Sequence, residues 1–212
     1  MVSRVQKLAA VLVVCCSGSA AAAGDAVSNF NSAGEHAFAS AYGETAPPVG
    51  YVDYCARQPD ECQPRGVSQP EVELSSERWR LLNEVNDYVN AKIRPAHDID
   101  LHGVPERWSI PTDAGDCEDY VLLKKRYLEE LGFPAATLLI TVVIEEQGGG
   151  HAVLSVRTTA GDFILDNRRD GIKRWSDTGY FFLKRQSQDN PLAWVALTPR
   201  NTPDPAAIAG GN

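Results

Sequence analysis

The pattern of hydrophobic and polar positions first predicts an amphipathic helix over residues 75–93. Hydrophobic residues recur there at spacings of three and four, at Trp79, Leu82, Val85, Val89 and Ile93. This spacing places them on one face of a helix. Ser75 or Ser76 is a suitable N-cap, and Pro95 lies just beyond the C-terminal end.

A second helix is predicted over residues 117–131, after a polar loop that contains two prolines. Asp116 stands at its N-cap position, and Gly132 follows its last turn. A capping residue before the first turn and a glycine after the last one are the expected asymmetry of helix ends. Both predicted helices precede the strand-like part of the chain.

Beyond Pro134 the pattern changes to that of β-strands. Apolar, β-branched segments alternate with turn residues and predict three strands, at 137–145, 151–158 and 163–167. A tight turn at 160–162 would join the last two as a hairpin. Shorter strands are predicted at 180–185 and 193–197. Helices followed by an antiparallel sheet predict the α+β fold class.

The first 23 residues have the pattern of a secretory signal peptide. Arg4 and Lys7 precede a short apolar stretch and a run of small residues that would suit a signal peptidase. A buried N-terminal helix is the alternative, but the stretch is uniformly apolar rather than amphipathic. A lipoprotein signal at Cys15 or Cys16 fits less well, because bulky Val14 stands where a small residue is expected.

The rest of the chain divides into an extended arm at 24–50, a folded domain at 51–198 and a flexible tail at 199–212. Removing the signal changes the formal net charge from −8 to −10, because Arg4 and Lys7 leave with it. Such an acidic chain is repelled by phosphate backbones and anionic lipids, so nucleic acid is not an expected partner. Without a second apolar run of spanning length, we expect no membrane insertion of the mature chain.

The cysteines that remain after signal removal are Cys55, Cys62 and Cys117. In an oxidising compartment an odd number predicts one disulfide and one free thiol. Cys55 and Cys62 lie close together in a polar, turn-rich segment and could close a small disulfide loop. Cys117 is then the free thiol, either buried and inert or chemically employed.

Cys117 begins the second predicted helix, in the sequence Gly-Asp-Cys-Glu-Asp. Free backbone N–H groups and the helix dipole at this end favour a negative charge, so a thiolate forms more readily there. A thiolate is the nucleophile of cysteine hydrolases. The position therefore indicates a catalytic nucleophile rather than a packing residue.

His151 opens the second strand directly after three glycines, and Asp166 ends the third. If these strands form the predicted hairpin, residue 151 lies opposite residues 166 to 168. The Asp166 carboxylate could then accept a hydrogen bond from the imidazole and fix its tautomer. Asp162 and Asp170 are competing acids, and Asn167 could fill the same role as an amide.

This order of residues resembles the transglutaminase-like branch of the papain superfamily and, within it, the bacterial transglutaminase-like cysteine proteinases. The resemblance covers roughly residues 50–197. It rests on Trp108 with Pro111, GDCEDYVLLKKRYLEELGFP, HAVLSV, LDN, the segment with Cys55 and Cys62, and the helix around 83–90. It implies a papain-like/transglutaminase-like fold, with the nucleophile at a helix N-terminus packed against an antiparallel sheet. The triad it implies is Cys117, His151 and Asp166.

The resemblance also implies Ca²⁺ bound by Asp116 and Glu118, possibly with Asp119. Carboxylate oxygens suit this ion rather than zinc. Three acids beside a thiol would raise its pKa, so a cation that neutralises them would restore reactivity. The alternative is that acids in a first helical turn only stabilise the helix. His97 and His102 lack the surroundings of a zinc site, and Trp108 is more readily explained by packing than as a wall of the substrate groove.

We therefore expect an exported, periplasmic cysteine endopeptidase. The resemblance implies that it clips a biofilm adhesin on the cell surface and that an inner-membrane cyclic-di-GMP receptor sequesters it. A transglutaminase or amide acyltransferase could use the same triad with an amine as acceptor. A non-catalytic calcium-binding module on the same fold is the third possibility, and it would leave Cys117 unreactive.

Overall fold

The computed structural model describes residues 37–65 and 69–199 of the chain. The predicted signal peptide, the first part of the predicted arm and nearly all of the predicted tail lie outside the described residues. None of the helices within the described ranges has the length and hydrophobicity that crossing a bilayer requires.

The two predicted helices are present with nearly the predicted ends. Helix α3 spans Ser76–Lys92, and the Ser75 hydroxyl caps it by accepting a hydrogen bond from the Arg78 amide at 3.2 Å. Helix α5 spans Cys117–Glu130. Gly132 follows α5 with a φ of 85°, the left-handed conformation that a glycine adopts without strain.

Seven antiparallel strands form the main sheet, in the order β1-β9-β8-β4-β5-β6-β7. The strands are β1 (Glu44–Thr45), β4 (Leu138–Ile144), β5 (Gly150–Thr158), β6 (Gly161–Leu165), β7 (Lys173–Arg174), β8 (Phe181–Gln186) and β9 (Trp194–Ala196). Their helices-first order and antiparallel pairing confirm the α+β class. A second, parallel pair joins β2 (Arg94–Pro95) to β3 (Ala114–Gly115), next to the start of α5.

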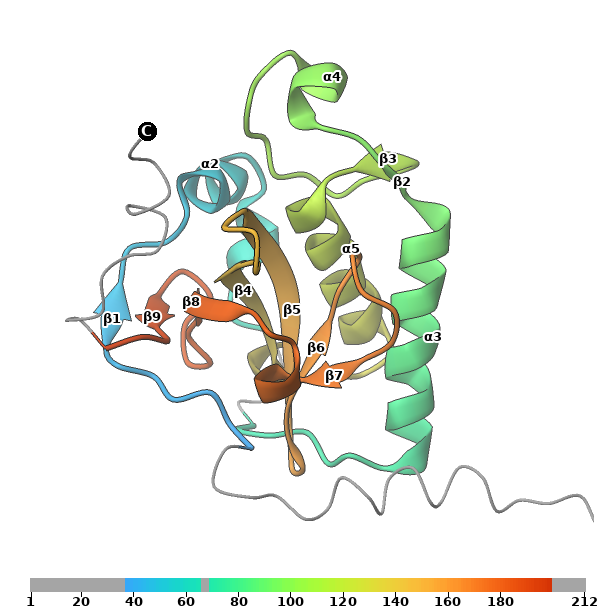
Figure 1. Cartoon of the computed structure of the whole chain (residues 1–212), viewed down its shortest axis with the longest axis vertical. Helices are drawn as coiled ribbons and strands as arrows, with labels where there is room; N and C mark the ends of the chain where they lie inside the picture. Colours follow the sequence, from blue (N-terminus) through green and yellow to red (C-terminus); the bar gives the residue numbers. More distant parts are fainter. Residues whose placement is uncertain (1–36, 66–68, 200–212) are drawn as a thin grey trace, which may run out of the picture.

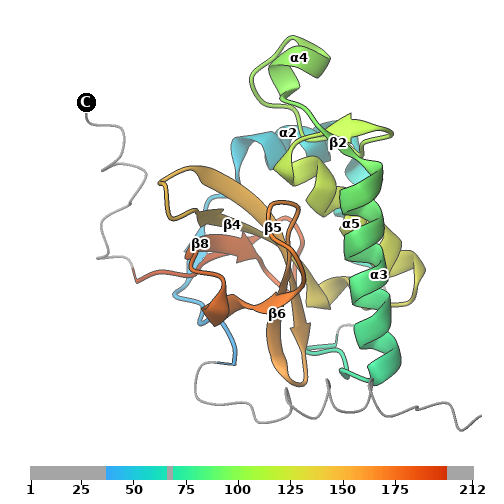
Figure 2. The same ribbon diagram turned by 45° about the vertical axis from the view of Figure 1, so that its right-hand side comes forward.

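Helices α3 and α5 cover one face of the main sheet (Figures 1 and 2). Alternate side chains of β5 separate two hydrophobic clusters. Ala152, Leu154 and Val156 belong to the large cluster that also contains the buried residues of α3 and α5. Val153 belongs to a smaller cluster with Tyr180 and Phe182. The sheet is therefore buried on both faces around β5.

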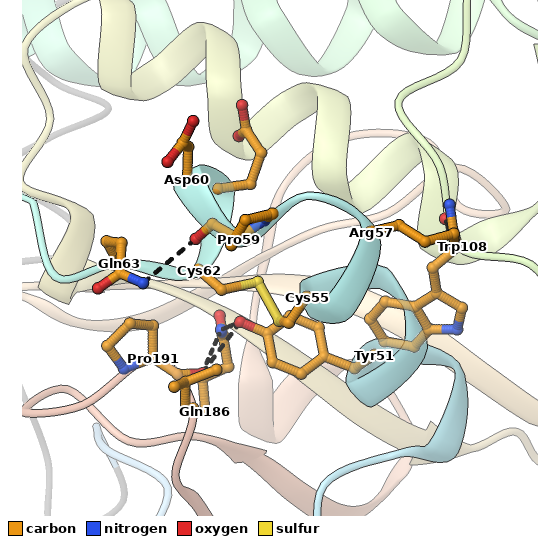
Figure 3. Close-up of a disulfide and its surroundings, with 12 residues drawn as sticks. Tyr51, Cys55, Arg57, Pro59, Asp60, Cys62, Gln63, Trp108, Gln186 and Pro191 are labelled. Carbon is orange, nitrogen blue, oxygen red and sulfur yellow. Dashed lines mark hydrogen bonds between the residues drawn. A yellow bond between two sulfur atoms is a disulfide. The ribbon is translucent and has the colours of Figure 1, made fainter.

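Short helices complete the domain: α2 (Val49–Arg57) with the 3₁₀ turn η1 (Pro59–Cys62), α4 (Asp98–His102), η2 (Ala135–Thr137) and η3 (Trp175–Asp177). The predicted disulfide is confirmed, because Cys55 at the end of α2 bonds Cys62 in η1 (Figure 3). Trp108 is buried, and its ring packs edge-on against Tyr51 of α2 at 5.6 Å. It thus packs in the core, against α2.

The described part of the predicted arm is hydrogen-bonded to the sheet and is non-helical up to Pro48, while its last two residues begin α2. Ala37 accepts a hydrogen bond from the Asp162 amide, and Ala39 donates one to the Asp162 carboxylate at 2.9 Å. Strand β1 then pairs with β9. These contacts join residues near the start of the described chain to its last strand.

Candidate active site

The structure brings His151 and Asp166 together at one end of the β5–β6 hairpin. The last paired residues on this side are Leu154 and Leu165, so continuing the register places residue 151 near residue 168, within the predicted range. The His151 ring nitrogen Nε2 lies 2.8 Å from the Asp166 oxygen Oδ1. Both side chains are nearly inaccessible, at 0% and 3% exposure. The hairpin therefore builds the predicted pair.

Several donors surround the Asp166 carboxylate. Besides His151, Oδ1 accepts a hydrogen bond from the Arg168 amide at 2.9 Å, and Oδ2 accepts one from the Tyr180 hydroxyl at 2.6 Å. Burial by itself raises the pKa of Asp166, but these three donors outweigh it and lower the pKa to about 2. Asp166 is therefore an anion at neutral pH, as an orienting acid requires.

The second nitrogen of His151 is available for proton transfer. An ionised Asp166 makes Nε2 the protonated nitrogen of a neutral imidazole. Nδ1 then carries the lone pair, and this atom is buried without a hydrogen-bond partner in the described part of the chain. A buried nitrogen without a partner is uncommon in proteins and marks a group with another task.

Cys117 is the first residue of α5 and is the only free cysteine among the described residues. Its thiol lies beside Glu118, with Sγ 3.1 Å from Oε2. Burial and the charge of Glu118 raise the pKa of the thiol, whereas the backbone N–H of Ala152 lowers it by hydrogen bonding to the sulfur. That contact places Cys117 against the residue that follows His151. The thiol is thus close to the base, and burial, with Glu118 beside it, favours its protonated form.

Three acids gather beside the thiol. Ligand oxygens of Asp98, Asp116 and Glu118 all lie within 4.8 Å of one another. Each of these residues has one carboxylate oxygen that is buried and has no hydrogen-bond partner within the described ranges. Unpaired buried carboxylate oxygens are costly, and oxygen donors in this number suit a hard cation. The cluster therefore fits a Ca²⁺ ion.

The raised pKa values of two acids in the cluster agree with a cation site. Burial, together with repulsion from Asp116, raises the pKa of Glu118 to about 9. Burial also raises the pKa of Asp116. Two neighbouring acids with raised pKa values would ionise fully once a cation neutralised them.

The structure changes two details of the expected metal site. The possible third ligand, Asp119, is outside this cluster: its Oδ1 accepts hydrogen bonds from the amide and hydroxyl of Ser109, at 2.7 and 3.3 Å, while its Oδ2 is buried without a hydrogen-bond partner among the described residues. Asp98 of α4, which the sequence analysis did not select, takes the third place in the cluster. Asp116 stands at the predicted N-cap position, but its side chain makes no capping hydrogen bond. Its carboxylate points towards the other two acids because that cluster, rather than the helix end, is its environment.

Two further residues at the site were also missed from the sequence. Tyr180, just before β8, binds the Asp166 carboxylate, and Asn90 of α3 donates to the Asp166 carbonyl at 2.8 Å. The acids that competed with Asp166 as the partner of His151 lie elsewhere. Asp162 is paired with two arginines, Arg157 and Arg185, and Asp170 is exposed. Asn167 lies in the groove that contains Cys117, together with Arg94, His97 and Arg168.

Comparisons with known proteins place the chain in a family. The family model described as "Bacterial transglutaminase-like cysteine proteinase BTLCP" matches residues 41–202. Calcium-bound Legionella pneumophila LapG is similar at 21% identity over 65% of this chain and 80% of that one, with a TM-score of 0.49. EGTA-treated LapG from the same organism is similar at 25% identity over 56% of this chain and 67% of that one, with a TM-score of 0.47. The sequence matches no curated protein. The family match spans both helices and the whole main sheet.

Proposed function

Because the chain belongs to the bacterial transglutaminase-like cysteine proteinases, we propose that Cys117, His151 and Asp166 are the catalytic triad of this cysteine protease. The observation that carries this proposal is the bonding of His151. One ring nitrogen lies 2.8 Å from Asp166, and the other is buried without a partner among the described residues. This is the arrangement of a general base held in one tautomer.

In the proposed mechanism, His151 Nδ1 accepts the proton of Cys117 and the thiolate attacks the carbonyl carbon of a peptide bond. The tetrahedral intermediate collapses to an acyl-enzyme when His151 gives the proton to the leaving amine. His151 then takes a proton from water, whose oxygen attacks the acyl group and releases Cys117. The Cys117 amide, at the first position of α5 where helix N–H groups lack an intrahelical partner, would donate to the oxyanion.

We further propose that Asp98, Asp116 and Glu118 hold Ca²⁺. The ion would supply positive charge beside the thiol and neutralise the acids that raise its pKa. Glu118 now accepts the hydrogen bond of the Cys117 thiol. If Glu118 turned its charge towards a cation instead, the thiol proton would be released for transfer to His151.

The substrate and the compartment are proposals that rest on the family resemblance and on residues 1–23. We propose a periplasmic enzyme that clips a biofilm adhesin on the cell surface. An inner-membrane cyclic-di-GMP receptor that sequesters the protease is the regulator implied by the same resemblance. The groove beside Cys117 contains both Arg94 and Asp100 and would receive the substrate chain.

The test is alkylation of Cys117 by iodoacetamide in the mature protein, followed by mass spectrometry across pH, with calcium and with EGTA. We expect fast labelling below pH 7 with calcium, since a free cysteine titrates well above that pH. We expect His151→Ala to slow labelling by about a hundredfold. His36→Ala is the matched control, because His36 belongs to the predicted arm, far in the sequence from the proposed triad and the acid cluster.

Labelling at the rate of an ordinary free thiol, unchanged in His151→Ala, would remove the proposed triad and favour a non-catalytic module.

Hydrolysis and transfer are separated by trapping the acyl-enzyme with an added primary amine. A cross-linked product that outcompetes hydrolysis would assign a transglutaminase activity to the same residues.

A further inference from the structure

The Asp166 carboxylate has one oxygen that His151 does not use. Oδ1 accepts from His151 and the Arg168 amide, whereas Tyr180 is the only donor to Oδ2 among the described residues, at 2.6 Å. With Asp166 3% exposed, water has little access to replace this contact. Loss of it would leave a buried charged oxygen unsatisfied and free the carboxylate to rotate.

Tyr180 also contacts the base itself. Its ring packs edge-on against the His151 imidazole, with the two centroids 5.8 Å apart and the planes at 74°. An aromatic edge in this geometry limits the tilt of the imidazole. The same side chain thus touches both members of the pair, through its hydroxyl on Asp166 and through its ring on His151.

Arg169 fixes the direction of the Tyr180 hydroxyl. The Arg169 Nε group donates to the hydroxyl oxygen at 3.2 Å, and the guanidinium lies over the ring, 5.3 Å from its centroid. An oxygen that accepts this bond directs its own proton to its other neighbour, which is Asp166. Glu146, in the turn before β5, pairs with the far end of the Arg169 guanidinium.

The backbone before Tyr180 is shaped for this contact. Gly179 has a φ of 77°, and a Cβ atom at this position would lie 2.5 Å from the Glu146 carboxylate. A larger residue would meet both backbone strain and the acid that holds Arg169. The sequence Thr178-Gly179-Tyr180 therefore delivers the ring to the pair from an element outside the β5–β6 hairpin.

From these contacts we propose that Tyr180 is a positioning residue of the triad, which holds Asp166 through its hydroxyl and His151 through its ring, with Arg169 holding Tyr180. The inference rests on the proposed function, because it assigns a partner to the proposed acid and base. Burial also keeps the pKa of Tyr180 above its ordinary value, so the phenol retains its proton and remains a donor.

The test compares Tyr180→Phe with Tyr51→Phe. Both remove a hydroxyl that donates a hydrogen bond, but Tyr51 donates to the Pro191 carbonyl near the disulfide (Figure 3). We expect Tyr180→Phe to slow iodoacetamide labelling of Cys117 about tenfold, the effect of one hydrogen bond to a charged group. Tyr51→Phe should label as the wild type does. Circular dichroism and thermal melting establish that both variants are folded.

A second readout follows the pair directly. The proton between His151 Nε2 and Asp166 should give a low-field proton NMR resonance that His151→Ala removes. We expect this resonance to shift or broaden in Tyr180→Phe and to stay in place in Tyr51→Phe. Arg169→Ala should slow labelling less than Tyr180→Phe, and the double variant should be no slower than Tyr180→Phe alone, since both act through one contact.

Failures of the two proposals can be told apart. Wild-type labelling that is fast and lost in His151→Ala, but unchanged in Tyr180→Phe with an unmoved resonance, overturns the role of Tyr180 and leaves the triad standing. Labelling that is slow in the wild type and insensitive to His151→Ala overturns the triad itself. Full additivity of Tyr180→Phe and Arg169→Ala would contradict the role given to Arg169.

Discussion

Asp166 and Glu118 are almost equally buried, at 3% and 5% exposure, yet the pKa of Asp166 is lowered to about 2 and that of Glu118 is raised to about 9. The two acids lie on opposite sides of the proposed reaction centre. We call the first region the base end (His151, Asp166 and Tyr180) and the second the nucleophile end (Asp98, Asp116, Cys117 and Glu118).

The difference comes from partners rather than from burial. Asp166 receives hydrogen bonds from a histidine, a tyrosine and a backbone amide, whereas Glu118 faces Asp116 and keeps one oxygen without a partner among the described residues. Protein donors stabilise the charge at the base end, and like charges oppose it at the nucleophile end. The fold thus supplies the partners of Asp166 itself, whereas the acids of the nucleophile end would gain theirs from the proposed cation.

The largest expected effect comes from breaking the base end. In Asp166→Asn the amide can no longer stabilise an imidazolium or fix its tautomer, so we expect labelling of Cys117 to fall by about a hundredfold or more. Rates from mass spectrometry in calcium give the measurement. Asp170→Asn is the matched control, because Asp170 is the exposed acid four residues along the same loop. Equal loss in both variants would contradict the assignment of Asp166.

The next largest effect is expected on the melting temperature when calcium is added to the nucleophile end. Calcium should raise the melting temperature of the wild-type protein by several degrees, because it binds only the folded cluster. The melting temperature of Glu118→Gln should depend on calcium much less than that of the wild type. In EGTA at neutral pH we expect this variant to melt higher than the wild type, because the Glu118 carboxyl must take up a proton on folding and an amide need not. In calcium we expect its melting temperature to rise little.

Differential scanning calorimetry of the wild type and of Glu118→Gln, in calcium and in EGTA, measures these melting temperatures. Glu84→Gln serves as control, because Glu84 is an exposed acid on α3 whose ion pair with Arg80 is at the surface. A Glu118→Gln variant that melts below the wild type in EGTA, or that responds fully to calcium, would exclude Glu118 as a ligand.

The two ends should also give opposite pH dependences of stability in EGTA. The folded-state pKa of Glu118 is raised from 4.5 to about 9, so it opposes folding increasingly as pH rises through this interval. The pKa of Asp166 is lowered from 3.8 to about 2, so the stability it provides, on the order of 2 kcal/mol, is lost as pH falls below about 4. Urea denaturation across pH should show a maximum on the acidic side of neutrality, and Glu118→Gln should flatten the alkaline side. A wild-type curve that rises from pH 5 to pH 9 would contradict the prediction for Glu118.

The smallest effect is expected from the surface pair of Arg168 with Glu145. Arg168 contributes its backbone amide to Asp166, while its side chain is 46% exposed and pairs with Glu145 at 2.5 Å. Arg168→Ala should therefore change the free energy of unfolding by less than about 1 kcal/mol and leave the labelling rate near that of the wild type. Urea denaturation measures the free energy of unfolding, and mass spectrometry measures the labelling rate. A large loss of labelling would show that the side chain, and not only the amide, belongs to the base end.

The base end was largely accessible from the sequence, because its geometry is local. His151 and Asp166 belong to neighbouring strands joined by a tight turn, so counting residues predicts that they meet. Helices α3 and α5 were likewise marked by clear hydrophobic periods and capping residues. Helix α2 was missed because it has only nine residues and its apolar valines do not mark the buried face: Val49 and Val52 are exposed, while Gly50 and Tyr54 are buried.

The nucleophile end and Tyr180 were less accessible because they depend on tertiary packing. Asp98 lies in a segment predicted as a polar loop, 20 residues before Glu118, and the β2–β3 pairing helps to bring α4 to the start of α5. Tyr180 reaches Asp166 from the approach to β8, after a glycine with positive φ. Neither position differs, in the sequence alone, from an ordinary loop acid or an ordinary strand tyrosine.

The tight turn between β5 and β6 also bears on the order in which the protein folds. Thr158 lies opposite Gly161, so the hairpin closes over very few residues, whereas Glu44 of β1 must find Val195 of β9 from the other side of the domain. The entropy lost on closing a loop grows with its length, so local pairings form ahead of distant ones. His151 and Asp166 are therefore expected to meet early during folding, and the β1–β9 edge to close last. The base end, whose charges are balanced by protein donors, is also the part of the proposed site that the folding chain is expected to assemble first.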